Sequence, residues 1–361
     1  MIIESMELKN FRNYRELQLH FDAKTNIFYG DNAQGKTNIL EAVYLSGTTK
    51  SHKGSRDRDM ILFGEDEGHL RTFVKKGEIE YQIDIHLKKN KTKGIAINGV
   101  PIRKASELFG IANFVFFSPE DLSIIKQGPG ERRRFLDMEL CQLDKVYLHH
   151  LANYNRIVVQ RNKLLKDLSF RPELKDTLDI WDIQMAEYGK KIIESRNAFI
   201  ESLGEIIRGI HEKLSGGKEE LTLSYEKHVG AEELYDAITR SRERDIRMKT
   251  SNVGPHRDDL MFAIGGVDIR KFGSQGQQRT AALSLKLSEI ELVKQVIHDT
   301  PVLLLDDVLS ELDHNRQNYL LDSIHDIQTM ITCTGLDEFV NHRFSINRVF
   351  RVVEGAVYSG N

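Results

Sequence analysis

The feature that most constrains this chain is a loop near its start, residues 30–37, that begins with one glycine and carries another ahead of a lysine. The loop fits the pattern GxxxxGK[ST], and its residues are Gly30, Asp31, Asn32, Ala33, Gln34, Gly35, Lys36 and Thr37. In such a loop backbone N–H groups converge on phosphate oxygens, the lysine reaches the β- and γ-phosphates, and the threonine hydroxyl holds Mg²⁺. Residues 25–29 are predicted to be a strand and residues 37–45 a helix, whose N-terminus helps to bind the anion. The segment predicts a site for ATP and Mg²⁺.

A matching acidic element lies about 270 residues further along the chain. Residues 302–305 are an apolar run that ends in Asp306 and Asp307. A buried parallel strand delivers such acids to the carboxyl edge of a sheet, where nucleotides bind. We expect Asp306 to hold Mg²⁺, directly or through water, and Asp307 to act in catalysis with Lys36 by polarising the attacking water. A site divided in this way predicts one ATPase core interrupted by a large insertion.

A short polar motif, residues 274–278, precedes this strand and opens a predicted helix. A serine hydroxyl, a bare glycine backbone and a helix N-terminus all favour an anion. The motif resembles the signature motif of ABC-type ATPases, which implies that Ser274, Gly276 and Gln277 bind the γ-phosphate of ATP held by a second subunit. Residues 310–313 match the D-loop of the same class. The alternative interpretation of residues 274–278 is a polar turn that only caps the helix.

Composition and charge exclude several classes of protein. The chain has 361 residues, a formal net charge of −3 and 40% hydrophobic residues, which suits a globular protein of two or three folding units. Its two cysteines, Cys141 and Cys333, are far apart, which argues against a disulfide framework or a zinc site and favours a reducing compartment. The start lacks the pattern of a signal peptide, and no apolar run approaches the roughly 18–20 residues that span a bilayer. We expect a cytoplasmic protein.

The pattern of hydrophobic residues predicts an α/β fold with a helical insertion. Residues 2–8, 16–21, 68–74, 79–87 and 94–97 are predicted strands, whereas residues 131–214 carry two apolar stripes at helical spacing. The stripes are separated by residues 170–172 and predict an antiparallel helical hairpin, about 50 Å long at 1.5 Å rise per residue. The predicted fold class is an ABC-type ATPase head, with a mixed sheet and a P-loop parallel sheet, and an inserted helical hairpin lobe. The predicted domains are 1–120, 121–250 and 251–361, of which the first and last form the head.

Two segments are locally basic, residues 75–104 and residues 240–249. Basic side chains that cluster on one face neutralise nucleic-acid phosphates, although a solvated edge or helix face gives the same pattern. The candidate DNA-binding residues are Arg132, Arg133, Arg134, Arg240, Arg242, Arg244 and Lys249. No aromatic-rich basic motif that would read bases is present, so we expect recognition of DNA shape and not of base sequence.

Together these motifs resemble the RecF family of bacterial recombination mediators, in the SMC/Rad50-like branch of ABC ATPases. The segments that carry the resemblance are residues 8–14, 51–53, 132–137, 253–260 and 274–280. The resemblance implies an ATP-dependent head-to-tail homodimer that sandwiches two nucleotides and binds gapped or single/double-strand junction DNA. It also implies loading of recombinase together with the RecO and RecR proteins, and it places Arg12 near the nucleotide phosphates.

Three positions depart from the wider ABC pattern. Asp307 stands where many ABC ATPases have a glutamate, and a shorter base should act slowly because general-base catalysis depends on hydrogen-bond reach. Residues 332–334 read Thr-Cys-Thr where a switch histidine is often found. Residues 116–119 occupy the expected place of a Q-loop but contain no glutamine. The first two departures predict a timer-like ATPase, in which ATP closes the clamp and slow hydrolysis opens it. We expect a weak ATPase that DNA stimulates.

Three other classes compete with this interpretation. A transporter ATPase would have its signature motif much closer to the P-loop than the roughly 240 residues found here. A P-loop kinase or GTPase would not need residues 274–278. A long-armed SMC-type structural protein would need a far longer helical hairpin.

Overall fold

The computed structural model describes residues 1–336 and 346–360, and it divides into two compact units. The first unit comprises Met1–Asp121 and Lys286–Asn361, and the second comprises Leu122–Leu285. The predicted second boundary lay at residue 250, whereas the structure has it at Leu285. The reason is that residues 221–226 and 259–264 pair as strands, which holds the segment after residue 250 with the helical lobe.

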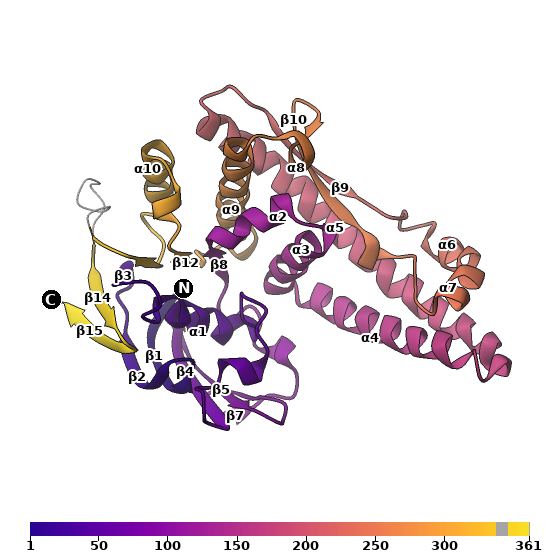
Figure 1. Cartoon of the computed structure of the whole chain (residues 1–361), viewed down its shortest axis with the longest axis horizontal. Coiled ribbons are helices and arrows are strands. Elements are labelled where there is room, and N and C mark those ends of the chain that lie inside the picture. Colours follow the sequence, from indigo (N-terminus) through magenta and orange to yellow (C-terminus); the bar gives the residue numbers. More distant parts are fainter. Residues whose placement is uncertain (337–345, 361) are drawn as a thin grey trace. The chain divides into compact units, whose positions relative to one another are not determined.

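The first unit contains an antiparallel sheet in the order β2-β1-β4-β5-β6-β7 (Figure 1). Its strands are β1 (Ile2–Phe11), β2 (Tyr14–His20), β4 (Glu67–Lys76), β5 (Ile79–Lys88), β6 (Gly94–Ile97) and β7 (Val100–Pro101). Asn98 and Gly99 join the last two strands with φ of 51° and 76°. Both angles are positive, as a tight hairpin turn requires, so the Asn-Gly signal in the sequence identified this turn.

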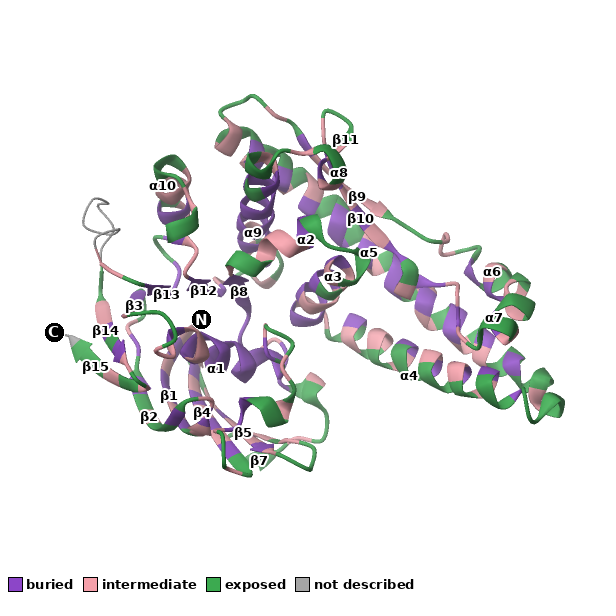
Figure 2. Cartoon of the chain, viewed as in Figure 1, coloured by how far each residue is buried: buried purple, intermediate pink, exposed green. Residues whose placement is uncertain are grey.

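The second sheet of this unit has the order β15-β14-β3-β13-β12-β8. From β14 to β8, each strand is parallel to its neighbour in this order. Its strands are β3 (Thr25–Tyr29), β8 (Phe114–Phe117), β12 (Val302–Asp306), β13 (Thr329–Cys333), β14 (Arg348–Val353) and β15 (Ala356–Gly360). All residues of β8, β12 and β13 are buried, as the purple ribbon of Figure 2 shows. Strands buried on both faces read as continuous apolar runs, which is why the sequence revealed β12. The hairpin of β14 and β15 was not predicted.

Helices and short 3-10 turns connect these strands. They are α1 (Lys36–Thr48), α10 (His314–Ser323), η1 (Asp57–Met60), η2 (Ala105–Glu107), η3 (Pro119–Asp121) and η6 (Leu309–Glu311), with the C-terminal part of α9 (Gln275–Ile297). Nearly all of α1 is buried, including the polar residues Lys36, Glu41, Ser46 and Thr48. No helix of the described residues is long and apolar enough to cross a membrane.

The second unit is dominated by the predicted helical hairpin, α4 (Lys145–Asp167) and α5 (Leu178–Ser215). Asp144 caps α4 by accepting a hydrogen bond from the Val146 N–H, and Gly216 ends α5 with a φ of 66°. The other elements of this unit are α2 (Leu122–Lys126), α3 (Pro129–Leu143), η4 (Pro172–Thr177), β9 (Leu221–Glu226), α6 (Leu234–Arg240), α7 (Arg242–Met248), η5 (Pro255–Arg257), β10 (Asp259–Ile264), β11 (Val267–Asp268), α8 (Ile269–Phe272) and the first turns of α9.

On α4, one position of the apolar stripe is occupied by a charged side chain, Arg161. Arg161 is fully buried, and its guanidinium donates to Asp182 and Asp245 at 2.7 Å each. Buried charges are tolerated when they are paired and hydrogen-bonded. The pairing therefore explains how a stripe interrupted by an arginine still packs as a hairpin.

Candidate functional site

The predicted phosphate loop lies between β3 and α1, at the carboxyl edge of the parallel sheet. Gly30 and Gly35 have φ of 150° and 115°, which favour glycine. A Cβ at Gly30 would lie 2.3 Å from the carbonyl oxygen of Val352, and one at Gly35 would lie 2.5 Å from the side-chain amide of Asn13. Gly30 has no room for a side chain, because the neighbouring atom belongs to the backbone. At Gly35 the Asn13 side chain can move aside, and it is the positive φ that favours glycine.

A cavity of about 200 Å³ opens beside this loop. It is lined by Asn32, Ala33, Gln34, Gly35, Lys36, Thr37, Asn38, Lys53, Asp306, Asp307 and Thr332. Predicted residues from both ends of the sequence therefore meet in one cavity. Lys53, Asn38 and Thr332 line it too, although the sequence analysis gave them no binding role. Lys53 had a signal in the sequence, because residues 51–53 carry part of the family resemblance.

The Lys36 ammonium lies at the mouth of the loop and donates to the carbonyl oxygens of Gly30 and Asp31, at 2.5 and 2.8 Å. Burial lowers the pKa of Lys36 below its ordinary value, and the nearby carboxylate of Asp307 opposes that shift. The two hydrogen bonds of this ammonium go to backbone carbonyls, whose place phosphate oxygens can take. The ammonium is therefore well suited to a phosphate.

The two predicted magnesium residues touch each other. The Thr37 hydroxyl donates to Oδ1 of Asp306 at 2.8 Å across 269 residues of sequence, and the Thr332 hydroxyl donates to the same oxygen at 2.7 Å. Mg²⁺ is bound in nucleotide sites by one or two carboxylates together with hydroxyl, water and phosphate oxygens. The donor set at Thr37 and Asp306 fits that preference.

Asp307 adopts a backbone conformation that is unusual for a residue other than glycine, with a φ of 54°. Its N–H donates to the Thr332 hydroxyl at 3.0 Å and, less closely, to the Thr332 carbonyl at 3.3 Å. Burial raises the pKa of the Asp307 carboxyl, the ammonium of Lys36 opposes this, and the charge of Asp306 adds to it. The predicted catalytic pair, Asp307 and Lys36, thus lies in one cavity and is electrostatically coupled.

Arg12 lies in the turn between β1 and β2 and forms an ion pair with the buried carboxylate of Glu41. Its guanidinium donates to both oxygens of the buried Glu41 at 2.7 and 2.6 Å, to the Ser55 hydroxyl and to the Asp59 carbonyl. Burial alone would raise the pKa of Glu41, but hydrogen bonds from Arg12 and Ser51 outweigh it and hold the pKa below its ordinary value. Arg12 does not line the cavity, so its predicted contact with phosphates stays a prediction.

The turn that follows Arg12 supports the phosphate loop, which the sequence analysis did not predict. The Asn13 amide donates to the Gln34 carbonyl at 3.1 Å, and the Tyr14 hydroxyl donates to the Gly35 carbonyl at 3.1 Å. From the other side, the turn of the β14–β15 hairpin donates its Gly355 N–H to the Gln34 carbonyl at 3.2 Å. Segments near both ends of the chain therefore fix the loop.

The signature-like motif opens α9 in the second unit as a capping box. The Ser274 N–H donates to the Gln277 side chain at 2.9 Å, and the Gln277 N–H donates to the Ser274 hydroxyl at 3.2 Å. Gln277 also donates to Glu219 at 2.9 Å. Ser274 and Gly276 remain exposed at this helix N-terminus. The structure thus contains the helix-capping turn of the alternative interpretation. It also leaves Ser274 and Gly276 accessible to a ligand.

The candidate DNA-binding residues have different environments. Arg132 does not suit a DNA contact, because its side chain is 1% exposed and forms an ion pair with Asp259. Arg242 binds Asp179 and Asp182, and Arg133 is half-buried and donates to the Asp258 carbonyl. The exposed candidates are Arg134, Arg240, Arg244 and Lys249.

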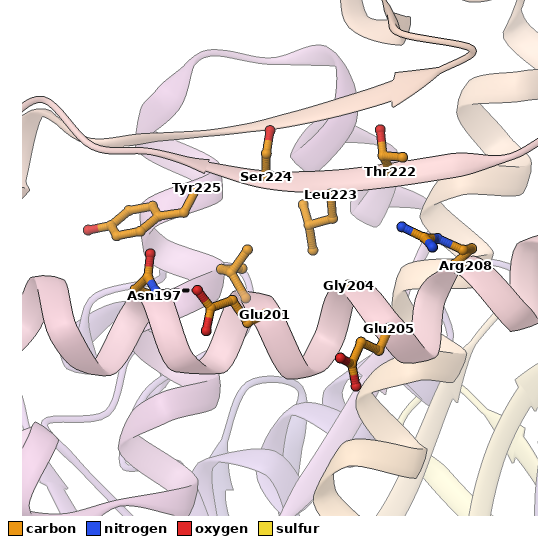
Figure 3. Close-up of a pocket in the computed structure, with 10 residues that line it drawn as sticks. Asn197, Glu201, Gly204, Glu205, Arg208, Thr222, Leu223, Ser224 and Tyr225 are labelled. Atoms are coloured by element: carbon orange, nitrogen blue, oxygen red, sulfur yellow. Dashed lines mark hydrogen bonds between the residues drawn. The ribbon is translucent and has the colours of Figure 1, made fainter.

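A larger cavity of about 300 Å³ lies between α5 and β9 in the second unit (Figure 3). Two exposed acids of its lining, Glu201 and Glu205, project from α5, and Arg208 lies one turn beyond them. Carboxylates repel phosphates, and this cavity has neither a glycine-rich loop nor a buried cation among its lining residues. The phosphate loop therefore stays the predicted nucleotide site.

Comparison with known proteins identifies the family. The family described as RecF/RecN/SMC N terminal domain matches residues 2–356. A protein of Agathobacter rectalis named DNA replication and repair protein RecF is 64% identical over 357 residues, 99% of each chain. A protein of Lachnospira eligens with the same name is 61% identical over 363 residues and covers 100% of each chain.

Solved structures agree with this assignment and confirm the predicted fold class. The structure of the recombination mediator protein RecF-ATPrS in the RecFOR pathway is 36% identical with a TM-score of 0.92, covering 100% of this chain and 98% of that one. An SmcHead bound to the C-winged helix domain of ScpA is 17% identical with a TM-score of 0.58, covering 100% and 97%. The latter likeness shows the fold alone, that of an ABC-type ATPase head. The chain belongs to the RecF family of DNA replication and repair proteins.

Proposed function

We propose that the chain is an ATP-dependent DNA-binding clamp of recombinational repair. Two copies close head to tail on ATP, bind gapped or junction DNA and help to load recombinase on single-stranded DNA. Slow ATP hydrolysis then resets the clamp. The observation that carries this proposal is the 2.8 Å contact between Thr37 and Asp306, which joins the two halves of a nucleotide site in one cavity.

In this proposal the phosphate loop binds ATP. The backbone of residues 30–35 surrounds the phosphates, and Lys36 exchanges its present carbonyl partners for the β- and γ-phosphates. Thr37 and Asp306 would hold Mg²⁺, which would supply positive charge to neutralise the phosphates. Relatives of this family include a structure described as RecF-ATP, 36% identical to this chain, which supports ATP as the ligand.

Asp307 acts as the base for hydrolysis. It accepts a proton from the attacking water while the oxygen of that water forms a bond to the γ-phosphorus, and the bond from the γ-phosphorus to the β–γ bridging oxygen breaks to release ADP. The aspartate is one methylene shorter than glutamate, which supports slow turnover. We further propose that DNA stimulates this weak activity.

The second half of each site comes from another copy of the chain. Ser274 and Gly276 are exposed at the N-terminus of α9, a helix of 23 residues, and its dipole favours negative charge. A γ-phosphate presented by a second copy fits this surface. ATP would thereby join the two copies, and hydrolysis would release them.

DNA binds through exposed basic side chains, and the partners are inferred from the family. Arg134, Arg240, Arg244 and Lys249 supply phosphate contacts, so affinity should fall steeply with salt. The structural relatives are described in the RecFOR pathway, which supports the RecO and RecR proteins as partners. We propose the cytoplasm as the location.

The test measures mass in solution by light scattering, with and without ATP and a short gapped duplex. Wild type is compared with Lys36→Met, which removes the phosphate ligand, and with Ser274→Arg, which blocks the trans surface. We expect a dimer only with ATP, stabilised by DNA and lost in both variants. Nucleotide binding, measured separately with a fluorescent ATP analogue, should survive in Ser274→Arg and fail in Lys36→Met. A wild type that binds ATP but stays monomeric, with DNA present or absent, would overturn the clamp.

A further inference from the structure

Strand β13 presents a buried hydroxyl to both acids of the proposed catalytic site. The strand lies between β3, which leads to the phosphate loop, and β12, which ends in the acids. In the parallel register Thr332 is the neighbour of Asp306 on β12 and of Phe28 on β3. Thr332 is 1% exposed and is therefore fixed by its surroundings.

This hydroxyl makes one hydrogen bond as donor and one as acceptor. It donates to Oδ1 of Asp306 at 2.7 Å and accepts from the Asp307 N–H at 3.0 Å. The first bond orients the carboxylate that also receives the Thr37 hydroxyl. The second bond holds the backbone where Asp307 has a φ of 54°. A non-glycine residue persists in that conformation only when surrounding contacts compensate its cost.

We infer that Thr332 is a positioning residue for ATP hydrolysis, which aligns the Asp306 carboxylate and directs the Asp307 side chain into the nucleotide cavity. The inference rests on the proposed ATPase function. Thr332 itself makes no bond to the reacting atoms in this account. Its effect should therefore fall on the rate of the chemical step and not on the binding of ATP, which depends on the phosphate loop.

The same strand supplies a matched control. Thr329 is also fully buried, but its hydroxyl donates to the carbonyl oxygen of Ile327 at 3.0 Å and contacts neither acid. Valine replaces threonine with nearly the same shape in both cases. Thr332→Val and Thr329→Val therefore both remove one buried hydroxyl, and only the first removes the link to the catalytic acids. Thr332→Ser keeps the hydroxyl and loses only a methyl group.

The first measurement is kinetic. Single-turnover hydrolysis of labelled ATP with the full chain in excess should be about 10- to 100-fold slower in Thr332→Val, because small displacements of catalytic groups cost about that much. The Kd for ATP should change by less than about 3-fold, as expected for a residue that acts only on the chemical step. Thr332→Ser and Thr329→Val should stay within about 3-fold of wild type in rate. If Thr332→Val does not fold, Thr332→Ala carries the same test.

The second measurement needs no nucleotide. Hydrogen–deuterium exchange of the peptide that contains Asp307 should be faster in Thr332→Val than in wild type, and unchanged in Thr329→Val. A Thr332→Val protein with wild-type rate, or with rate and affinity reduced by the same factor, would overturn the inference. If wild type does not bind or hydrolyse ATP, the proposed function fails instead. In that case exchange at Asp307 still decides whether Thr332 holds this backbone.

Discussion

The buried arginine of the helical hairpin gives the sharpest stability prediction. Arg161 is fully buried and donates to Asp182 and Asp245 at 2.7 Å and to the Ser251 hydroxyl at 2.9 Å. Both carboxylates are buried as well, with side-chain exposures of 0% and 1%. Replacement of Arg161 by methionine keeps most of the volume but leaves two buried negative charges without their shared cation.

The size of the stability loss depends on the hydrogen bonds that each carboxylate retains after Arg161 is replaced. Removal of one partner from a buried ion pair costs about 3–5 kcal/mol. Asp182 still accepts from Arg242, and Asp245 still accepts from the Asn252 side chain at 2.9 Å. We therefore expect the lower end, a loss of about 3 kcal/mol in the free energy of unfolding. That is a large share of the roughly 5–15 kcal/mol typical of a domain.

The assay uses the single tryptophan of the chain, Trp181, which lies in α5 beside Asp182 and reports on the lobe. Urea unfolding followed by its fluorescence gives the free energy of unfolding for wild type, Arg161→Met and Arg156→Met. Arg156 is an exposed arginine on the same helix, so its replacement should cost less than about 0.5 kcal/mol. A loss below about 1 kcal/mol for Arg161→Met would refute the argument.

Three further predictions concern the site and the pH dependence. Lys36→Met should abolish binding of a fluorescent ATP analogue, because it removes the ammonium of the phosphate loop, and the second lysine of the cavity, Lys53, is exposed and lies outside that loop; retained affinity would place the nucleotide elsewhere. Asp307→Asn should slow ATP hydrolysis by about 10²–10⁴-fold while ATP still binds; a normal rate in a phosphate-release assay would remove Asp307 from catalysis. Burial lowers the pKa of His256 from 6.5 to about 4 in the folded protein, so the unfolded chain takes up this proton first as pH falls. Stability measured with Trp181 in urea should therefore drop between pH 6.5 and 4, by up to about 3 kcal/mol more in wild type than in His256→Gln; equal pH profiles would contradict this.

Much of the fold was readable because its signals are local. The phosphate loop, the apolar β12 and the two helical stripes each depend on neighbouring residues and a fixed period. The β14–β15 hairpin has weaker alternation, and it was missed. The boundary at Leu285 also depends on a non-local fact, the pairing of β9 with β10 across the connecting helices. Sequence periodicity identifies elements, whereas which elements share a sheet is decided by contacts between distant residues.

The same distinction governs the functional residues. A run such as Arg132, Arg133 and Arg134 reads as one basic patch, but on a helix successive side chains point about 100° apart. The structure accordingly buries the first against Asp259, half-buries the second and exposes the third. Thr332 is the opposite case, a residue that the sequence did not mark as functional. In the sequence it is only one of the residues found where other ABC ATPases often have a histidine. Its hydrogen bond to Asp306 becomes visible only in the structure, where β13 lies beside β12. Motifs identify the groups that are predicted to contact ATP, whereas the residues proposed to orient those groups depend on the register of distant strands, which a single sequence does not reveal.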